Sequence, residues 1–479
     1  MTPPIHGRTA FPRRSKLATL LAAAAVVGGC ASFSPDGGFG VVQQTAKDRL
    51  GKDLVMAKSD ADHDTIAKRV AELLANPLTV DDAVQIALLN NPGLQADFQE
   101  LGITEADLVR AGRLPNPHFA MLRARDGAEF KIEQALTFNV FSLVTMPLAV
   151  QIEKRRFEQV QRAVAMQTLS LAADTRKAYF SALAADETVR YMLQVRKAAE
   201  ASAELARRMA EVGNFNKLQR AREQSFQADA ALNVARAEQA RVGARERLTR
   251  LMGLWGQQTG FSLPERLPDL PKEAQDRPAI EQLAIEQRLD VQAAKLDTEA
   301  LARNLGLTKA TRFINVLEFG PARVLEGLKG DPYKRGYEVS FELPLFDWGT
   351  ARVAKAEAIY MQSVNLARQT AVNARSEVRE AYRTYRSSYD IARHHRDEIV
   401  PLRQRIAAEN QLRYNGMQIG VFELLADARV QIASVNNYIE SLRDFWIAQA
   451  DLDMALIGKP SLGATARPAI TGEPGGATH

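Results

Sequence analysis

Histidine and cysteine, the side chains that most often ligate metals or act in catalysis, are scarce in this chain. The sequence has one cysteine and six histidines, which are His6, His63, His118, His394, His395 and His479. Their spacing matches no metal-ligand pattern, and the sequence has no glycine-rich phosphate loop and no nucleophile-elbow motif. The 11 methionines are scattered, which argues against a thioether metal path. We therefore predict no catalytic residue, no resident metal and no cofactor, and we do not expect an enzyme.

The single cysteine, Cys30, lies at the end of a segment that is typical of an export signal. A basic region, the apolar run Leu17–Val27 and the small residues of VGGC precede or include it. Small residues followed by Cys resemble the bacterial lipobox, in which the thiol is lipidated, palmitate included, after cleavage. Ala31 follows rather than Asp, which in such lipoproteins implies delivery to the outer membrane. We predict a signal peptide over residues 1–29 and lipidation of Cys30, with a free thiol as the alternative.

Charge is nearly balanced once the signal is removed. Four of the 62 basic residues and none of the 57 acids lie in the first 29 residues, so the remainder carries 58 basic and 57 acidic side chains. This balance excludes a general basic surface for nucleic acid. No later stretch reaches the roughly 18 uncharged apolar residues of a transmembrane helix.

The chain contains an internal duplication. Segments 207 residues apart resemble one another, and an upstream pair is 197 apart: GNFNKLQRAREQ (213–224) with GVFELLADARVQ (420–431), FKIEQAL (130–136) with YEVSFEL (337–343), and IALLNNPGLQA (86–96) with LAIEQRLDVQA (283–293). Repeats of this kind indicate a duplicated structural unit. We expect an extension over 30–77, a first repeat over 78–253, a linker over 254–278, a second repeat over 279–458, and a disordered tail over 459–479.

Each repeat reads as a helix, two strands, a very long helix, a turn and a returning helix. The first helix should break at Pro92, and the second long helix should kink at Pro401. The long helix of the first repeat, about 148–212, would extend on the order of 100 Å. Alanine-rich contact positions let such helices approach closely. The predicted fold class is mainly α with a small β part, with helices arranged as a long coiled-coil barrel.

The predicted strands alternate polar and apolar residues over the length of a membrane β-strand. The polar face, with Glu129, Lys131, Glu133, Glu338 and Glu342, would line water. Phe138, Phe141, Phe346 and Trp348 would form an aromatic girdle at the strand ends. A half-buried sheet of a water-soluble protein, with these aromatics in its core, alternates in the same way and stays an alternative.

Four strands cannot close around a pore, and lipid does not tolerate open sheet edges. Two protomers would give eight strands with a filled interior, whereas three would give twelve strands with a lumen. A conduit therefore favours a homotrimer whose protomers share a 12-stranded transmembrane β-barrel.

Three segments carry a resemblance to a known family: Ala83–Pro117, Gly336–Gly349 and Arg413–Gln431. With the duplication they cover about 78–458, and in this order they resemble the TolC-like outer-membrane efflux proteins. The resemblance implies a trimeric barrel in the outer membrane of a Gram-negative bacterium, continued by an α-helical periplasmic tunnel. It also implies docking onto a periplasmic adaptor (membrane fusion) protein and an inner-membrane pump.

The resemblance assigns roles to the two helix–turn–helix tips. Acids at the start of the second returning helix would form a cation-selective ring at the periplasmic entrance. Glu423 occupies one matching position, and the second is Ala426, with Asp427 just beyond it. The adaptor-docking tips would be Val212, Gly213, Asn214, Ile419, Gly420 and Val421. Simple helix-dipole stabilisation of the acids and tight-turn glycines are the structural alternatives.

These features predict a lipid-anchored outer-membrane exit duct of a multicomponent efflux pump. An outlet for type I protein secretion and a non-pore, lipid-anchored periplasmic coiled-coil scaffold remain alternatives. Drugs, metal ions, organic acids and proteins would all pass through such a duct, and the sequence does not choose among them.

Overall fold

The structure is a computed structural model, and it describes residues 32–313, 316–328 and 330–460. The predicted signal peptide, the predicted lipidation site Cys30 and residues 461–479 of the predicted tail lie outside the described residues. Two compact units are present, and each draws on both predicted repeats. Unit 1 holds the described residues up to Gly38 with Leu101–Val160 and Lys295–Leu366, and unit 2 holds Phe39–Glu100, Gln161–Ala294 and the described residues from Ala367.

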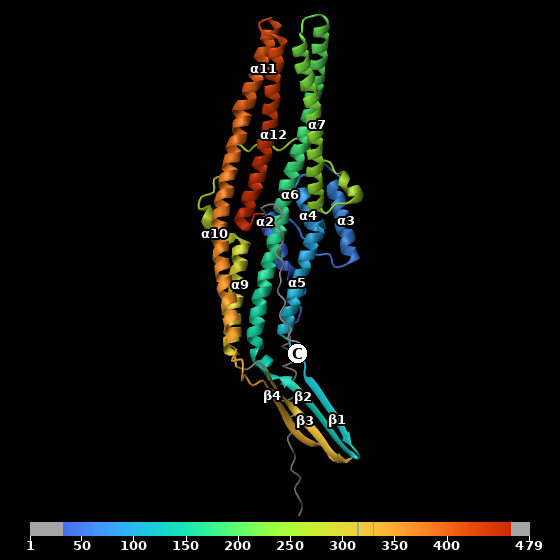
Figure 1. The fold of residues 1–479 in the computed structure, drawn as a ribbon, viewed down its shortest axis with the longest axis vertical. Coiled ribbons are helices and arrows are strands. Elements are labelled where there is room, and N and C mark those ends of the chain that lie inside the picture. Colours follow the sequence, from blue (N-terminus) through green and yellow to red (C-terminus); the bar gives the residue numbers. More distant parts are fainter. Residues whose placement is uncertain (1–31, 314–315, 329, 461–479) are drawn as a thin grey trace, which may run out of the picture. The chain divides into compact units, whose positions relative to one another are not determined.

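Helices dominate the described chain (Figure 1). None of those in the described ranges combines the length and the apolar character needed to cross a bilayer. In chain order the helices are α2 (Phe39–Leu50), α3 (Asp60–Leu74), α4 (Val80–Asn90), α5 (Pro92–Ala111), α6 (Val140–Glu211), α7 (Lys217–Met252), α8 (Ile280–Gln287), α9 (Leu289–Ala310), α10 (Thr350–His394), α11 (Val400–Asn415) and α12 (Val421–Ile457), with a 3₁₀ turn η1 (Gly256–Gly260) and a π turn η2 (His395–Ile399).

Both predicted proline effects are confirmed. The first helix of the first repeat is divided into α4 and α5, and Pro92 is the first residue of α5. The second long helix is interrupted by η2, which ends two residues before Pro401. Proline lacks an N–H, and its ring displaces the carbonyl four residues before it. One turn widens as a result, so that the Val400 N–H donates to the carbonyl of His395, five residues back.

Unit 1 contains one four-stranded antiparallel sheet, in the order β1-β2-β3-β4. The strands are β1 (His118–Asp126), β2 (Glu129–Asn139), β3 (Leu317–Leu328) and β4 (Lys334–Phe341). Gly127, with φ of 55°, makes the turn between β1 and β2. The pairing of β2 with β3 joins the hairpins of the two predicted repeats, and β1 and β4 are the edges. Asn139 then accepts a 2.8 Å bond from the Ser142 N–H, so α6 begins directly after β2.

The junctions between short helices hold the ends of the returning helices in unit 2. At the α4–α5 junction, the Asn91 amide donates to the Leu251 carbonyl at 2.8 Å, and Asn90 donates to the carbonyls of Met252 and Gly253 at 3.1 and 2.8 Å. The last carbonyls of a helix have no partner within it. The two asparagines therefore satisfy the end of α7, which is the structural role of Asn90 and Asn91 in the first copy of the repeated segment.

At the α8–α9 junction, Arg288 binds the end of a returning helix in the corresponding way. Its guanidinium is 1% exposed and donates to the Ala455 carbonyl at 3.4 Å, near the end of α12. Asp290 binds it in a bidentate pair at 3.0 and 2.7 Å, and Glu377 of α10 lies at 2.7 Å. A buried guanidinium is tolerated only when it is paired in this way. Leu251 and Ala455, each a carbonyl bound by the side chain at its junction, are 204 residues apart.

The predicted linker over 254–278 packs against the main core of unit 2. Leu254, Phe261, Leu267 and Leu270 are each 5–6% exposed and lie in a cluster with α4, α6, α7 and α12. The Trp446 indole N–H donates to the Pro268 carbonyl at 3.0 Å. A proline-rich segment, regular only in the short 3₁₀ turn η1, thus contributes core side chains and ties the helices of this unit together.

Candidate functional site

The sheet has one charged face. Residues paired across neighbouring strands project to the same side, so the register places Glu129, Lys131, Glu133 and Glu338 together, as predicted. Glu342 follows the last residue of β4. In the described strands this charged face carries six acids and two lysines: Asp126, Glu129, Glu133, Glu318, Glu326, Glu338, Lys131 and Lys334. Lys131 lies 2.9 Å from Glu133, and Lys334 lies 4.0 Å from Glu326.

The opposite face, which we call the apolar face, exposes large hydrophobic side chains. Phe119 is 61% exposed and Tyr337 is 75% exposed, and the Tyr337 ring lies 6.1 Å from that of Phe319. Exposed apolar residues continue after the strand in β4's connection to α10, namely Leu343, Leu345, Phe346 and Trp348. Of the predicted girdle, Phe138, Phe346 and Trp348 are exposed, whereas Phe141 is half-buried in the first turn of α6. A contiguous apolar surface of this kind is typical of a protein face that lipid or another chain covers.

The first helical hairpin of unit 2, α6 and α7, closes with a tight turn that we call tip 1. Gly213 takes the left-handed conformation, with φ of 82°. Its N–H donates to the Ala210 carbonyl at 3.2 Å, and the Asn214 N–H donates to the Met209 carbonyl at 2.8 Å. These two bonds define a Schellman turn, which satisfies the last carbonyls of α6. Tip 1 therefore ends α6 in a standard way, with glycine at the position that glycine suits best.

The start of α7 is capped by side chains. Asn216 accepts a bond from the Gln219 N–H, and Gln219 in turn accepts one from the Asn216 N–H, both at 2.9 Å. This reciprocal pair is a capping box, which satisfies two N–H groups that lack partners in the helix. Phe215, only 9% exposed, packs nearby with Ala206 and with Tyr414 and Leu425 of the second hairpin.

Tip 2 joins α11 and α12 by the same turn with different residues. The left-handed position is held by Met417, with φ of 59°, and its side chain is 94% exposed. The Met417 N–H donates to the Tyr414 carbonyl at 3.0 Å, and the Gln418 N–H donates to the Arg413 carbonyl at 2.8 Å. The N-cap residue of α12 is Gly420, which has no side chain to cap the helix.

The two tips correspond at a separation of 204 residues rather than 207. Gly213 corresponds to Met417 and Asn216 to Gly420, because these residues have the same roles in the turn. The repeated Gly-x-Phe motif is therefore shifted by three residues relative to the turn. Gln219 and Glu423 become equivalent, and so do Glu223 and Asp427. The sequence signal for this register was an N-cap residue followed three positions later by Gln or Glu.

The two predicted ring acids differ in their surroundings. Glu423 is exposed and is the third residue of α12, where the helix dipole stabilises a carboxylate. Asp427, one turn further on, is half-buried and accepts a hydrogen bond from the Asn410 amide of α11. Asp427 is thus engaged within its own hairpin, and Glu423 is the more accessible acid at tip 2.

Glu223 of α7 links the two hairpins of unit 2, and we did not predict this contact. Its side chain is fully buried, accepts a 2.7 Å bond from the Ser202 hydroxyl of α6, and lies 2.7 Å from a guanidinium nitrogen of Arg429 on α12. The Arg429 guanidinium also lies 4.3 Å from the ring centre of Phe226. The sequence signal for this contact was an acid seven residues before the buried Ala230, which places it on the same buried side of α7.

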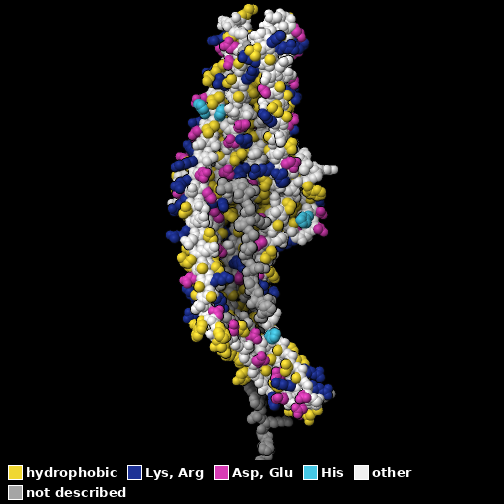
Figure 2. All heavy atoms as spheres, in the orientation of Figure 1, with side chains coloured by type: hydrophobic (Ala, Val, Ile, Leu, Met, Phe, Trp, Pro, Cys, Tyr) yellow, Lys and Arg dark blue, Asp and Glu magenta, His cyan; other side chains and the backbone are white. Residues whose placement is uncertain are grey.

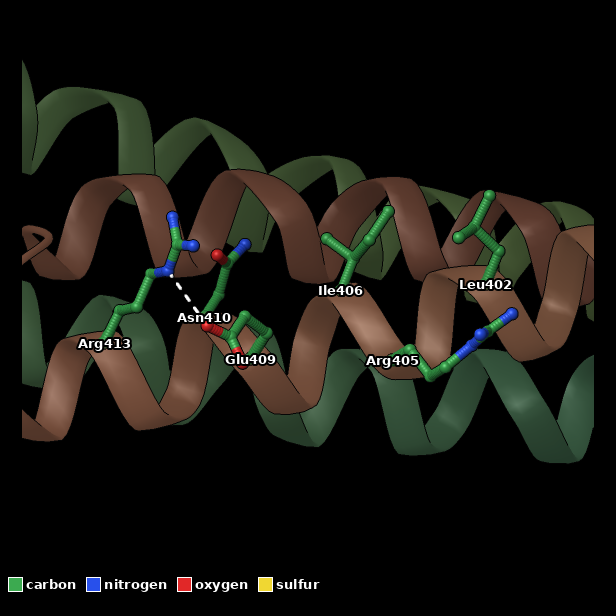
Figure 3. Close-up of a pocket in the computed structure, with 6 residues that line it drawn as sticks. All are labelled: Leu402, Arg405, Ile406, Glu409, Asn410 and Arg413. Carbon is green, nitrogen blue, oxygen red and sulfur yellow. Dashed lines mark hydrogen bonds and ion pairs between the residues drawn. The ribbon is translucent and has the colours of Figure 1, made fainter.

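The predicted docking residues lie at the two tips. Val212 is 71% exposed, Gly213, Asn214 and Gly420 are exposed, and Ile419 is half-buried. Val421 is the first residue of α12. Nearby, α11 carries a shallow groove of about 380 Å³ (Figure 3), lined by Leu402, Arg405, Ile406, Glu409, Asn410 and Arg413. Arg413 pairs with Glu409 at 3.1 Å at one end of this groove.

Among the described residues, no three His, Cys, Asp or Glu side chains are arranged to hold a metal ion. Comparison with family models gives no match. The cobalt-zinc-cadmium resistance protein CzcC of Cupriavidus metallidurans is 27% identical over 192 residues, which are 38% of this chain and 43% of CzcC. The match thus spans less than half the length of that curated relative.

Solved structures show a likeness over most of the chain. The CmeC outer membrane channel of Campylobacter jejuni has a TM-score of 0.67 at 16% identity and covers 87% of this chain and 91% of CmeC. The outer membrane protein VceC of Vibrio cholerae scores 0.66 at 15% identity over 79% and 96% of the two chains. A structure of CusC, from work on its folding and transmembrane channel formation, scores 0.66 at 18% identity over 79% and 92%.

These likenesses show that the chain has the fold of the TolC-like outer-membrane efflux channels, so the resemblance seen in the sequence is confirmed for the fold. The expectation that the chain is not an enzyme agrees with them, because the similar proteins are named as an outer membrane channel, an outer membrane protein or a metal resistance protein.

Proposed function

We propose that this chain is the outer-membrane exit duct of a multicomponent efflux system in a Gram-negative bacterium. The observation that carries the proposal is the four-stranded sheet with one charged and one exposed apolar face, on a chain with the fold of outer-membrane channels. Lipidation of Cys30 would anchor the protein in the outer membrane. A periplasmic adaptor protein and an inner-membrane pump would be its partners and would supply the energy for transport.

The open sheet supports a homotrimer. Among the described strands, β1 and β4 each have one row of backbone N–H and C=O groups that faces no other strand. Lipid offers these groups no hydrogen bonds, so β1 of one protomer would pair with β4 of the next. Three protomers would close a barrel of twelve strands, which is wide enough for a lumen. The charged face would line the lumen, and the apolar face would contact lipid.

Glu423 is our candidate for the entrance constriction. Three copies around a threefold axis would repel one another and attract cations. Asp427 would be a second, weaker member, because its bond to Asn410 already uses part of its carboxylate. The adaptor would contact the exposed tip residues, with the groove on α11 as an adjoining surface that offers two arginines over apolar side chains.

Divalent metal cations are the cargo class that we favour. CzcC, by its name, is a resistance protein for cobalt, zinc and cadmium, and the charged face here holds three times as many acids as lysines in the described strands. Deletion of the gene should then raise sensitivity to these metals more than sensitivity to drugs. The opposite pattern would favour a drug duct, and loss of a secreted protein would favour the type I outlet.

Conductance in planar bilayers tests the channel itself. The purified full-length protein should form cation-preferring pores, and Glu423→Gln should reduce the preference more than Asp427→Asn does. Glu238→Gln, which removes an exposed acid of α7 away from the tip, is the matched control. A wild-type protein without conductance would leave the non-pore scaffold as the better account, and unchanged selectivity in Glu423→Gln would remove the ring assignment.

A further inference from the structure

All the arginines of the four described strands lie on the apolar face. They are Arg123 and Arg125 of β1, Arg323 of β3 and Arg335 of β4, and the register places all four on the side of Phe119 and Tyr337. No acid shares this face within the described strands, whereas the charged face holds six. The sheet therefore separates its charges, with arginines on one side and carboxylates with two lysines on the other.

The four arginines gather toward the turns that connect the strands. Arg125 is one residue from the end of β1, and Arg323 is five residues from the end of β3, directly across from Arg335. At about 3.3 Å per residue, all four lie within roughly 17 Å of a strand end. Farther from these turns lie large exposed apolar side chains of the face, among them Phe119, Tyr337 and Phe341. In Figure 2, basic and acidic side chains crowd the turn end of the sheet, and hydrophobic ones lie where the strands meet helices.

Each arginine is exposed and available to an anion. In the part of the chain that the structure describes, no carboxylate forms an ion pair with any of the four. Arg125 donates through Nε to the Gly127 carbonyl at 2.8 Å, and Arg323 donates through Nε to the Gln134 side chain at 2.6 Å. These bonds use the inner nitrogen of each guanidinium and fix its stem.

Aromatic rings support the same guanidinium groups. Arg123 and Arg125 lie 6.0 and 5.2 Å from the ring centre of Phe130, and Arg323 lies 4.9 Å from that of Tyr333. Such contacts orient a planar guanidinium without neutralising it.

We propose that Arg123, Arg125, Arg323 and Arg335 form a binding surface for the phosphate groups of anionic lipids in the outer leaflet. The proposal rests on the proposed function, because it takes the apolar face to be the lipid-facing side of a barrel. An arginine on that side is strongly unfavourable at the bilayer centre and tolerated near the headgroups. Guanidinium groups bind phosphate oxygens in bidentate pairs, so the positive surface and the lipid phosphates are complementary.

Lipid retention tests this surface. The full-length protein would be placed in phosphatidylcholine nanodiscs that contain either a diphosphorylated glycolipid, lipid A, or its dephosphorylated form, and retained lipid would be measured by native mass spectrometry. We expect the wild type to prefer the diphosphorylated form by about ten-fold, as several charge-assisted contacts allow. Arg323→Gln with Arg335→Gln should lower this preference several-fold, and the variant with all four arginines changed to glutamine should lose it.

Lys131→Gln with Lys334→Gln is the matched control, since it removes the same charge as the arginine pair from the opposite face. This control should keep the wild-type preference. Equal retention by the fourfold variant and the wild type, or an equal loss in the lysine control, would overturn the proposal. Conductance measured on the same samples separates the two proposals. Pores without a lipid preference refute this one alone, whereas a wild type without pores refutes the proposed function.

Discussion

Tip 1 and tip 2 form the same backbone turn, but they stabilise it with different residues. In tip 1 a glycine takes the left-handed position, and Asn216 with Gln219 caps the helix that follows. In tip 2 a methionine takes the left-handed position, and a glycine stands at the N-cap. Each residue type of tip 2 is less favourable where it lies. A left-handed conformation strains any side chain with a Cβ, and glycine at an N-cap offers no acceptor.

The two tips therefore have unequal local stability despite their shared geometry. Tip 1 also buries Phe215, whereas its counterpart in tip 2, Ile419, is only half-buried. Tip 2 therefore depends more on contacts outside itself, such as the pair between Arg429 and Glu223. Local opening by native-state hydrogen exchange, which reports the free energy of each helix end separately, can measure the difference.

The largest effect is expected from the contact that holds the second hairpin to the first. Glu223→Ala leaves the Arg429 guanidinium half-buried without its carboxylate and removes the acceptor of Ser202. We expect the free energy of opening of α7 and α12 to fall by about 3 kcal/mol. Glu423 is exposed, and its equivalent in tip 1 is the uncharged Gln219. Glu423→Ala should therefore change the free energy of opening by only about 0.5 kcal/mol.

A double variant sharpens this result. Glu223→Gln with Arg429→Gln removes both charges and should recover part of the loss, because no unpaired charge then stays between the hairpins. Similar losses for Glu223→Ala and Glu423→Ala would show that the link between the hairpins contributes nothing, and the comparison of the tips would then reduce to the turns alone.

The next largest effect is expected from substitutions at the left-handed position. They should change the stability of the two tips in opposite directions. Gly213→Ala should destabilise tip 1 by about 1 to 2 kcal/mol, since it places a Cβ at φ of 82°. Met417→Gly should stabilise tip 2 by about 1 kcal/mol, because the Met417 side chain is almost fully exposed and loses few contacts. Exchange rates at the ends of α6 and α11 measure both, and a loss of stability in Met417→Gly would show that this side chain packs in solution.

The capping residues give the smallest effect. Asn216→Ala should cost about 1 kcal/mol at the start of α7, because the capping box is lost. Gly420→Asn should add only about 0.3 kcal/mol at the start of α12, since glycine is already acceptable there. Amide exchange in the first turn of each helix reports the change. A gain at α12 as large as the loss at α7 would mean that Glu423 already acts as half of a capping box.

Much of the fold could be predicted from the sequence because its signals are local. Pro92 and Pro401 act on the hydrogen bonds of their own helices, so the two helix interruptions were found at the right places. Alternation within strands likewise predicted the charged face before the register was known. The start of α6 was placed too late, because the cap by Asn139 left no strong sequence signal beside Pro147.

The candidate site was harder to predict, because its key relations are between distant residues. The 207-residue spacing of the repeated motif is real in the sequence, yet the turns obey a spacing of 204, which depends on which residue becomes left-handed and which caps. At the 207-residue spacing Glu423 and Asp427 would correspond to Asn216 and Arg220, which are not acidic. At the 204-residue spacing, Asp427 of tip 2 corresponds to an acid of the first hairpin, Glu223. Glu423 against Gln219 is then the one charge difference left between these two pairs.

The sequence by itself determined the duplication, the long helices, the alternating strands and the absence of a catalytic motif, because each depends on residue type at short spacing. Only the tertiary structure decided that Glu223 and Arg429, 206 residues apart, meet in a buried pair, and that Asp427 turns to Asn410 while Glu423 stays exposed. It alone also decided that the arginines of three strands share one face. Burial and cross-strand register bring such groups together, and neither is encoded in the local spacing of residues.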